Sequence, residues 1–270
     1  APDGETGTCA LQCLRWGTAM IDDLSRIMMA AQRTALEDLL PSDPQGAVKT
    51  RRRITRGLSD RVQAMVQALS PSVIAEIGAH EASFSKAMKT SCPQARVIAM
   101  EANPQVHSAF AADLEAAGVE YWNGCVSSRG GTRTFTVPVR ADGSHRITMG
   151  SLLSDRQAVG EHSYEVQSER LDDLVGDIDN ALWIDVEGGV AEVFKGGEAT
   201  LARSRLVYVE VETRQRWKEQ WTDRQVIDHL RAFDLHGVAR DIQQSWQYNL
   251  LFLKGDVLRD ERILSSGGLI

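Results

Sequence analysis

Two apolar runs decide the fold of this chain: Val73-Ile74-Ala75-Glu76-Ile77-Gly78-Ala79-His80-Glu81-Ala82-Ser83-Phe84-Ser85 and Arg96-Val97-Ile98-Ala99-Met100-Glu101. The first run ends in a turn of small residues at Gly78, and the second ends on an acid, Glu101. This layout is typical of a nucleotide-binding βαβ unit, because a glycine lets backbone approach a ligand and the acid can accept two ribose hydroxyl groups. The sequence therefore predicts a nucleotide-type cofactor at this turn.

The residues of the turn distinguish between cofactors. It holds one glycine, whereas the dinucleotide fingerprint uses Gly-x-Gly-x-x-Gly to hold a pyrophosphate. An acid, Glu76, stands two residues before Gly78. S-adenosylmethionine (SAM) has no phosphate and carries a cationic amino group and a sulfonium. We therefore expect SAM, with Glu76 near its cationic end and Glu101 on its ribose. An NAD-dependent Rossmann oxidoreductase is the alternative.

Composition narrows the class of protein. The chain has 270 residues, of which 43% are hydrophobic and 25% charged, with a net charge of −7, which argues against a general nucleic-acid binder. No apolar run is long enough for a transmembrane helix, and no signal peptide is visible. Cys9, Cys13, Cys92 and Cys125 are expected to be free thiols in a reducing compartment. We expect a cytoplasmic protein with no nucleic-acid or membrane partner.

The periodicity of the apolar residues predicts an α/β fold. Apolar early strands favour a mostly parallel sheet covered on both faces, and the short polar loop Gln243-Gln244-Ser245 favours a terminal antiparallel hairpin. The seven expected strands are 73–77, 96–100, 119–122, 182–186, 206–211, 237–241 and 248–253. The helices expected between them are 82–90, 104–117, 190–203 and 223–233.

The domain organisation is predicted as a helical N-terminal extension over 1–70, a cofactor-binding domain over 71–256 and a C-terminal tail over 257–270. Within the domain, residues 128–170 are expected to form a long irregular insert with a short ribbon over 132–137. Inserts of this length are often lids or binding loops, and a surface decoration is the other interpretation.

The N-terminal extension shows helical periodicity over 11–40. The pattern Thr34-x-x-Glu37 indicates a capping box and hence two helices there. Residues 41–46 are expected to form a loop, and Ser59 is expected to cap a further helix that ends at Leu69.

Carboxylates end two neighbouring strands of the predicted sheet. Asp185 and Glu187 fall on one side of the run Trp183-Ile184-Asp185-Val186-Glu187-Gly188-Gly189, and Glu210 and Glu212 share one side of the next strand. Unpaired charges are costly to bury, and ligands of open α/β sheets bind at the carboxyl ends of strands. These acids therefore indicate a working pocket; salt-bridged or exposed strand ends are the alternative.

Three motifs resemble those of the FkbM-type SAM-dependent methyltransferases: Glu76-Ile77-Gly78-Ala79-His80-Glu81-Ala82, Glu101-Ala102-Asn103-Pro104 and Leu182-Trp183-Ile184-Asp185-Val186-Glu187-Gly188-Gly189-Val190. The resemblance covers roughly residues 73–254. It implies a Rossmann-like class I methyltransferase fold with a seven-stranded sheet. It also implies a SAM-dependent enzyme that methylates a hydroxyl group of a sugar or natural-product scaffold, with a small-molecule or glycan acceptor.

The chain departs from the family pattern at four positions. Ala82 replaces a glycine at the start of a helix, which is tolerable if the backbone there is helical. His80 replaces an asparagine, Trp183 a lysine and Val190 an acid. The last two departures leave room for a third interpretation, a module that keeps the fold without activity.

The cofactor-binding residues expected from the motifs are Glu76, Gly78, Ala79, His80, Ala82, Ser83, Glu101, Ala102, Asn103, Cys125, Val126 and Asp185. Asp185, Glu187 and His80 are the candidate catalytic bases, although His80 could instead pack on the cofactor or cap the helix. No metal is assigned; Asp185 with Glu210 or Glu212 could supply oxygen ligands to a divalent cation. The sequence does not choose between these routes, and it leaves a homo-oligomer open.

A basic run and a pair of tryptophans are further candidates for binding the acceptor. The basic run Lys49, Arg51, Arg52, Arg53 and Arg56 is either a solvated face or a clamp for an anionic acceptor. Trp217 and Trp221 would share a face if their segment is helical, for packing or for stacking on a sugar ring.

Overall fold

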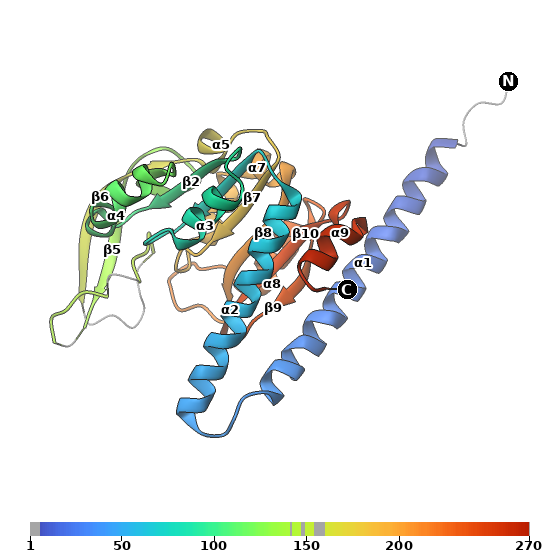
Figure 1. The fold of residues 1–270 in the computed structure, drawn as a ribbon, viewed down its shortest axis with the longest axis horizontal. Helices are drawn as coiled ribbons and strands as arrows, with labels where there is room; N and C mark the ends of the chain where they lie inside the picture. Colours follow the sequence, from blue (N-terminus) through green and yellow to red (C-terminus); the bar gives the residue numbers. More distant parts are fainter. Residues whose placement is uncertain (1–5, 141, 147–148, 154–159, 270) are drawn as a thin grey trace.

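The computed structural model describes residues 6–140, 142–146, 149–153 and 160–269, with only the backbone for 6–19. A seven-stranded sheet in the order β3-β2-β1-β7-β8-β10-β9 forms the centre of the molecule, with helices on both faces (Figure 1). Its strands are β1 (Val73–Ile77), β2 (Arg96–Glu101), β3 (Glu120–Asn123), β7 (Asn180–Ile184), β8 (Ser204–Glu212), β9 (Leu235–Arg240) and β10 (Gln247–Lys254). The predicted α/β fold is confirmed, because β10 is antiparallel to both β8 and β9 and the other pairings are parallel.

The strand β1 shows why the early strands are apolar throughout. Ala75 and Ile77 point into one core, and Ile74 points into the other, since neighbouring side chains of a strand face opposite ways. Both cores are covered by helices, so no face of β1 meets water. The helices from residue 83 onward are α3 (Ser83–Ser91), α4 (Pro104–Ala116), α5 (Leu171–Leu174), α6 (Val190–Lys195), α7 (Glu198–Arg203), α8 (Asp223–Arg231), η1 (Val257–Arg259) and α9 (Glu261–Ser266).

The insert is more regular than predicted. A second sheet in the order β4-β6-β5 contains β4 (Cys125–Val126), β5 (Gly131–Val139) and β6 (Gly160–Glu169). The ribbon expected over 132–137 is therefore confirmed as part of a long antiparallel hairpin, and the expectation of an irregular insert is wrong. In Figure 1 the hairpin projects from the side of the molecule that carries β2 and α4.

The N-terminal extension contains two long helices, α1 (Thr6–Asp38) and α2 (Pro44–Leu69). The two-helix prediction for 11–40 is wrong, because the Thr34 hydroxyl bonds to the Ala30 carbonyl inside one continuous helix. The capping role of Ser59 is also wrong, since it lies in the middle of α2. Asp43 caps α2 instead, accepting a 2.6 Å hydrogen bond from the Gly46 amide. None of the described helices is both long and apolar enough to cross a membrane.

The helix α1 lies along β9, the last strand of the sheet (Figure 1). Ser25 donates its hydroxyl hydrogen to the Gly237 carbonyl, and the Gln32 amide donates to the Val238 carbonyl at 3.1 Å. The same Gln32 side chain accepts the Arg240 backbone N–H at 3.1 Å. Polar side chains of α1 therefore bond to backbone groups of β9.

The helix predicted over 190–203 is broken into α6 and α7. A Cβ at Gly196 would overlap the carbonyl oxygen of Ser127, so the chain passes too close there for a longer side chain. The C-terminal segment also forms structure: α9 packs against α2, and Val257 and Ile263 are buried.

The Gly78→Ala substitution is expected to destabilise the fold strongly. Gly78 has a φ of +80°, and an added Cβ would overlap the Asp185 carbonyl oxygen. We expect the free energy of unfolding to fall by roughly 3–5 kcal/mol, combining left-handed backbone strain with overpacking. Urea denaturation measures it.

Gly176→Ala is the matched control, because Gly176 has a φ of +88° and nothing within 4 Å of an added Cβ. It carries the backbone strain alone, roughly 1–2 kcal/mol. Equal losses in the two variants would show that the contact with Asp185 is unimportant.

Candidate functional site

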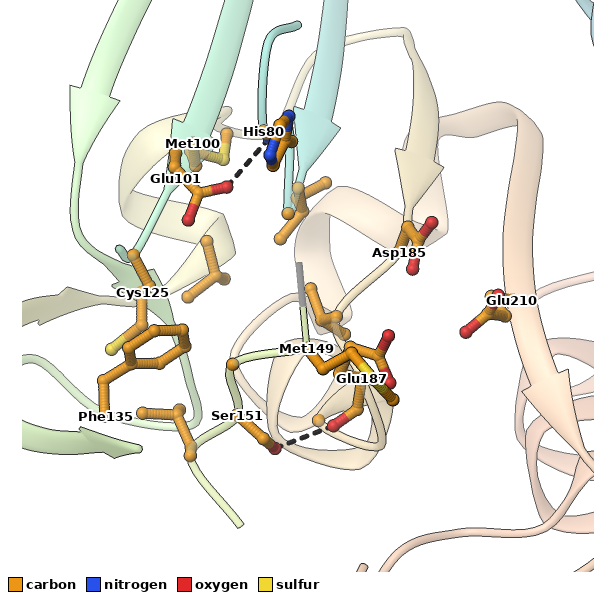
Figure 2. Close-up of a pocket in the computed structure, with 18 of the residues that line it drawn as sticks. His80, Met100, Glu101, Cys125, Phe135, Met149, Ser151, Asp185, Glu187 and Glu210 are labelled. Atoms are coloured by element: carbon orange, nitrogen blue, oxygen red, sulfur yellow. Dashed lines mark hydrogen bonds between the residues drawn. The ribbon is translucent and has the colours of Figure 1, made fainter. Parts of the chain in front are cut away.

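A cavity of about 430 Å³ opens at the carboxyl ends of β1, β2, β7 and β8. Figure 2 shows Glu101 and His80 on one side of it, and Asp185, Glu187 and Glu210 on the other. The remaining predicted residues that line it are Gly78, Ala102, Cys125 and Val126. The structure therefore brings most of the predicted site residues to one place.

Backbone hydrogen bonds hold the turn after β1 against both neighbouring strands. The Gly78 and Ala79 amides donate to the Met100 carbonyl at 3.0 and 2.9 Å, and the Asp185 amide donates to the Ile77 carbonyl at 2.9 Å. Three strand ends are thus fixed relative to one another, and the cavity lies over them.

The Glu101 carboxylate is bound by the turn that it faces. One oxygen accepts the His80 N–H at 2.8 Å, and the other accepts the Asn103 N–H at 2.7 Å. Burial raises the pKa of Glu101, while these two N–H donors act in the opposite direction. A carboxylate oxygen can accept more than one hydrogen bond, so both oxygens keep acceptor capacity toward the cavity that Glu101 lines.

Glu76 does not line this cavity. It points to the opposite side of β1, is 6% exposed, and accepts hydrogen bonds from the Ser85 amide at 2.9 Å and the Ser85 hydroxyl at 2.6 Å. Glu76 therefore anchors the first turn of α3. Burial raises its pKa to about 7. Strand alternation could have indicated this orientation, because Glu76 lies one residue before the end of β1.

Two departures from the family motif fall at left-handed backbone. His80 and Ala82 both have a φ of 48°, a conformation that asparagine and glycine adopt more easily. The expectation of helical backbone at Ala82 is wrong, because Ala82 is the residue before α3 and its side chain is fully buried. The His80 ring lies 5.8 Å from that of Phe110, centre to centre.

Carboxylates at the other side of the cavity form a crowded group, in which Glu187 and Glu210 line the cavity and Glu212 lies beside them outside its lining. Glu187, Glu210 and Glu212 each place one oxygen within 4.8 Å of the others. Asp185, expected with Glu210 and Glu212, is not part of that trio, although it lines the same cavity. The Gln247 amide donates to Glu210 at 2.7 Å, and the Gln220 amide donates to Glu212.

Burial and mutual repulsion perturb these acids. Burial, followed by the nearby Glu101 and Asp241 carboxylates, raises the pKa of Asp185 to about 6. Burial and the neighbouring acids, first Asp185, raise the pKa of Glu210 well above its ordinary value and that of Glu212 to about 7. Perturbed titration of several acids in one cavity is typical of a functional site.

The insert closes one side of the cavity. The Ser151 hydroxyl donates a 2.7 Å hydrogen bond to the Glu187 carbonyl, which ties the insert to the turn after β7. Gly150 lies against the ring of Phe135, where an added Cβ would overlap that ring. Composition offered no signal for the Phe135 and Met149 contacts, which depend on how the β5–β6 hairpin folds back.

Several residues predicted for the cofactor site lie outside the cavity lining. Ala79 and Ser83 line a second cleft, and Asn103 caps α4 by accepting the Gln105 N–H at 3.0 Å. The shared face of Trp217 and Trp221 is wrong: their segment is not helical, and Trp217 is fully buried against Gly188.

Two of the four cysteines can be assessed. Cys92 and Cys125 are buried free thiols, as predicted. The side chains of Cys9 and Cys13 lie outside the described residues.

A family model and a curated relative both match the chain. The family model of the methyltransferase FkbM domain matches residues 73–250. A curated relative, the 2-O-methyltransferase NoeI of Sinorhizobium fredii (strain NBRC 101917 / NGR234), is 24% identical over 189 residues, covering 63% of this chain and 77% of the relative.

Solved structures resemble the chain more loosely. The N-terminal domain of EvdMO1, with SAH bound, is 11% identical with a TM-score of 0.43, covering 80% of this chain and 82% of that one. A TehB-like SAM-dependent methyltransferase from Corynebacterium glutamicum is 11% identical with a TM-score of 0.38, covering 77% and 97%.

The buried acid Glu76 is expected to make folding stability depend on pH. Its folded pKa of about 7 lies above its ordinary value of 4.5, so the fold favours the protonated form. The associated stability is complete below about pH 4.5 and is lost as the pH rises through 7. The loss is roughly 3 kcal/mol, at about 1.4 kcal/mol per pH unit of difference.

Glu76→Gln keeps an acceptor for Ser85 but cannot ionise. Urea denaturation at pH 5 and pH 8 should therefore show a smaller fall in the variant than in the parent protein. Glu115→Gln, an exposed position on α4, is the control and should leave the fall unchanged. An unchanged pH dependence in Glu76→Gln would contradict the raised pKa.

Proposed function

The chain belongs to the FkbM methyltransferase family and is a methyltransferase; from this premise we propose that it uses SAM to methylate a hydroxyl group of a sugar or natural-product scaffold. The position of Glu101 supports the cofactor assignment, because its carboxylate lines the cavity and is oriented by the His80 and Asn103 N–H groups. The 2-O-methyltransferase activity named for the NoeI relative supports oxygen as the methylated atom.

The residues of the cavity fit SAM. Glu101 offers two oxygens with free acceptor capacity, which suits a ribose with two adjacent hydroxyl groups. The first turn of α3, where a dinucleotide would place its pyrophosphate, opens instead on the second cleft through Ser83. No arginine or lysine is among the described residues that line the cavity, which favours SAM over NAD with its anionic pyrophosphate.

Methyl transfer requires alignment, exclusion of water and removal of the hydroxyl proton. When bound, SAM supplies an electrophilic methyl group. The acids Asp185, Glu187 and Glu210 lie across the cavity from Glu101, where an acceptor hydroxyl would have to enter (Figure 2). We assign proton removal to Asp185, because a pKa of about 6 leaves it ionised at neutral pH while keeping it basic. His80 lies beside Glu101 and is assigned to packing on the cofactor.

A divalent cation is the second route to an activated hydroxyl. Glu187, Glu210 and Glu212 would hold it through carboxylate oxygens, the ligand type that hard cations prefer. The cation would lower the pKa of the acceptor hydroxyl. Activity that survives treatment with a chelator and dialysis would remove this route.

Glu101→Ala is expected to weaken binding of SAH, the demethylated product of SAM. The variant loses charge-assisted hydrogen bonds worth roughly 1.5–3 kcal/mol, or about a tenfold to hundredfold increase in Kd. Calorimetry with SAH and NAD measures it, with the exposed Glu115→Ala as control. Unchanged SAH affinity in Glu101→Ala would place the cofactor elsewhere, and tight NAD binding would support an oxidoreductase.

Asp185→Asn is expected to lower kcat by roughly a hundredfold or more on an acceptor found by screening glycans, because it removes a general base without changing shape. SAH affinity should change less than threefold. In the parent enzyme kcat/KM should rise with pH through about 6, as Asp185 ionises.

Glu187→Gln, measured in parallel, separates the two acids. Full activity in both variants would place the catalytic group elsewhere. An absence of turnover on every glycan, with SAH bound normally, would favour a module that has lost activity.

A further inference from the structure

A second cleft, of about 810 Å³, lies between α2 and the turn that leads into α3. We call it the α2 cleft. One face of α2 forms a wall of it, through residues spaced three and four apart, among them Arg51, Arg52 and Arg56. Lys49 and Arg53 belong to the same basic run but do not line the cleft. The structure thus divides the run into two sets.

The arginines of the α2 cleft have no carboxylate partner. No ion pair or hydrogen bond of Arg51, Arg52 or Arg56 is found among the described residues, and the Arg51 Nε is buried without a partner. An inward helix face normally carries apolar residues, as Leu58 and Val62 do further along α2. This face carries arginines instead. Arg51 is half-buried, and its Nε is a buried donor that an oxyanion could satisfy, while Arg52 and Arg56 are exposed and add two solvated cations beside it.

Acids that line the cleft are engaged elsewhere or stand apart. Glu76 is bound by Ser85, and Glu81 accepts a 2.8 Å hydrogen bond from the Ser83 hydroxyl. Asp60 lies on α2 without an ion pair among the described residues. None of them neutralises the arginines, so the cleft keeps donors for an incoming oxyanion.

An aromatic surface forms another part of the α2 cleft. Trp183 is partly exposed there and packs between Phe84 at 4.6 Å and Tyr208 at 4.0 Å, centre to centre. This is the residue that replaces the lysine of the family motif. The two aromatic neighbours hold Trp183 in place, and the part of the indole that remains exposed gives the cleft an apolar surface for a sugar ring.

The α2 cleft adjoins the cofactor cavity. Gln243, in the loop between β9 and β10, lines both. One ligand could therefore occupy the cleft and still reach the cavity. The arginine wall belongs to α2, which lies outside the residues that match the family model.

We propose that the α2 cleft binds an anionic sugar acceptor, with its phosphate or carboxylate on Arg51, Arg52 and Arg56 and its ring on Trp183. The hydroxyl to be methylated then enters the cavity past Gln243. This assignment rests on the proposed function, because it names the acceptor of the same site.

The test uses the full chain and calorimetry with glucose 1-phosphate, glucuronate and methyl glucoside. Glucose 1-phosphate or glucuronate should bind at least tenfold more tightly than the neutral methyl glucoside, and salt should weaken the binding. The tighter of the two identifies phosphate or carboxylate as the anionic group. No preference for either anion over methyl glucoside would overturn the proposal.

Two double variants separate the site from general charge. Arg52→Ala/Arg56→Ala should weaken the preferred anion at least tenfold, and Lys49→Ala/Arg53→Ala less than twofold. Both pairs are exposed, lie four residues apart on the same helix and lose the same net charge. If both double variants lost the same anion affinity, the preference would come from long-range charge attraction and the proposal would be overturned.

SAH affinity, measured on the same proteins, keeps this proposal apart from the proposed function. Unchanged SAH binding in Arg52→Ala/Arg56→Ala supports an acceptor role. A loss of SAH binding there would assign the arginines to the cofactor carboxylate and overturn the acceptor assignment. Failure of SAH to bind the parent protein would contradict the proposed function, while anion binding to the cleft would still be measurable.

Discussion

The contact between Gly78 and the backbone of Asp185 is the constraint on which the rest of the site depends. It brings the ends of β1 and β7 closer than any side chain at position 78 would permit. The turn after β1 is then held on its other side by the Met100 carbonyl. Backbone atoms of these strand ends therefore form the base of the cavity, and acidic side chains line its sides.

The acids of the cavity separate into two groups by their partners. Glu101 accepts backbone N–H groups from His80, in the turn after β1, and from Asn103, just after its own strand, so its orientation follows from the backbone around it. Glu210 and Glu212 are oriented by glutamine side chains from later parts of the chain. Like charges gathered in a partly buried site raise one another's pKa values, and this crowding costs folding stability near neutral pH. Functional sites commonly carry such a cost.

The sequence was informative where local chemistry decides structure. The strands around Gly78 and Asp185 follow from apolar runs that end at small or acidic residues, and the cavity follows from the rule that ligands bind at strand ends. The sequence was misleading where contacts between distant segments decide the local structure. The break between α6 and α7 depends on Ser127 passing beside Gly196, and the burial of Trp217 depends on Gly188. The glycines are visible in the sequence, but nothing near them indicates that Ser127 and Trp217 are the residues that approach them.

The direction of side chains was the second feature that the sequence did not predict correctly. Motif position alone placed Glu76 in the cofactor site, whereas the pleat of β1 turns it toward α3. The basic run on α2 could not be divided from sequence, because helical spacing groups residues by face but does not show which face lies against the rest of the domain. Tertiary packing supplied the division of the run into Arg51, Arg52 and Arg56, which line the α2 cleft, and Lys49 and Arg53, which do not.

The packing of α1 along β9 also affects whether strands of two molecules can pair. A strand at the edge of a sheet leaves one row of backbone donors and acceptors open, and such an edge can recruit a strand from another chain. Ser25 and Gln32 occupy part of that row in β9. The opposite edge, β3, spans only Glu120–Asn123 and offers little to pair with. The long N-terminal helix thus leaves this part of the β9 edge unavailable to a strand from another molecule, a consequence independent of methyl transfer.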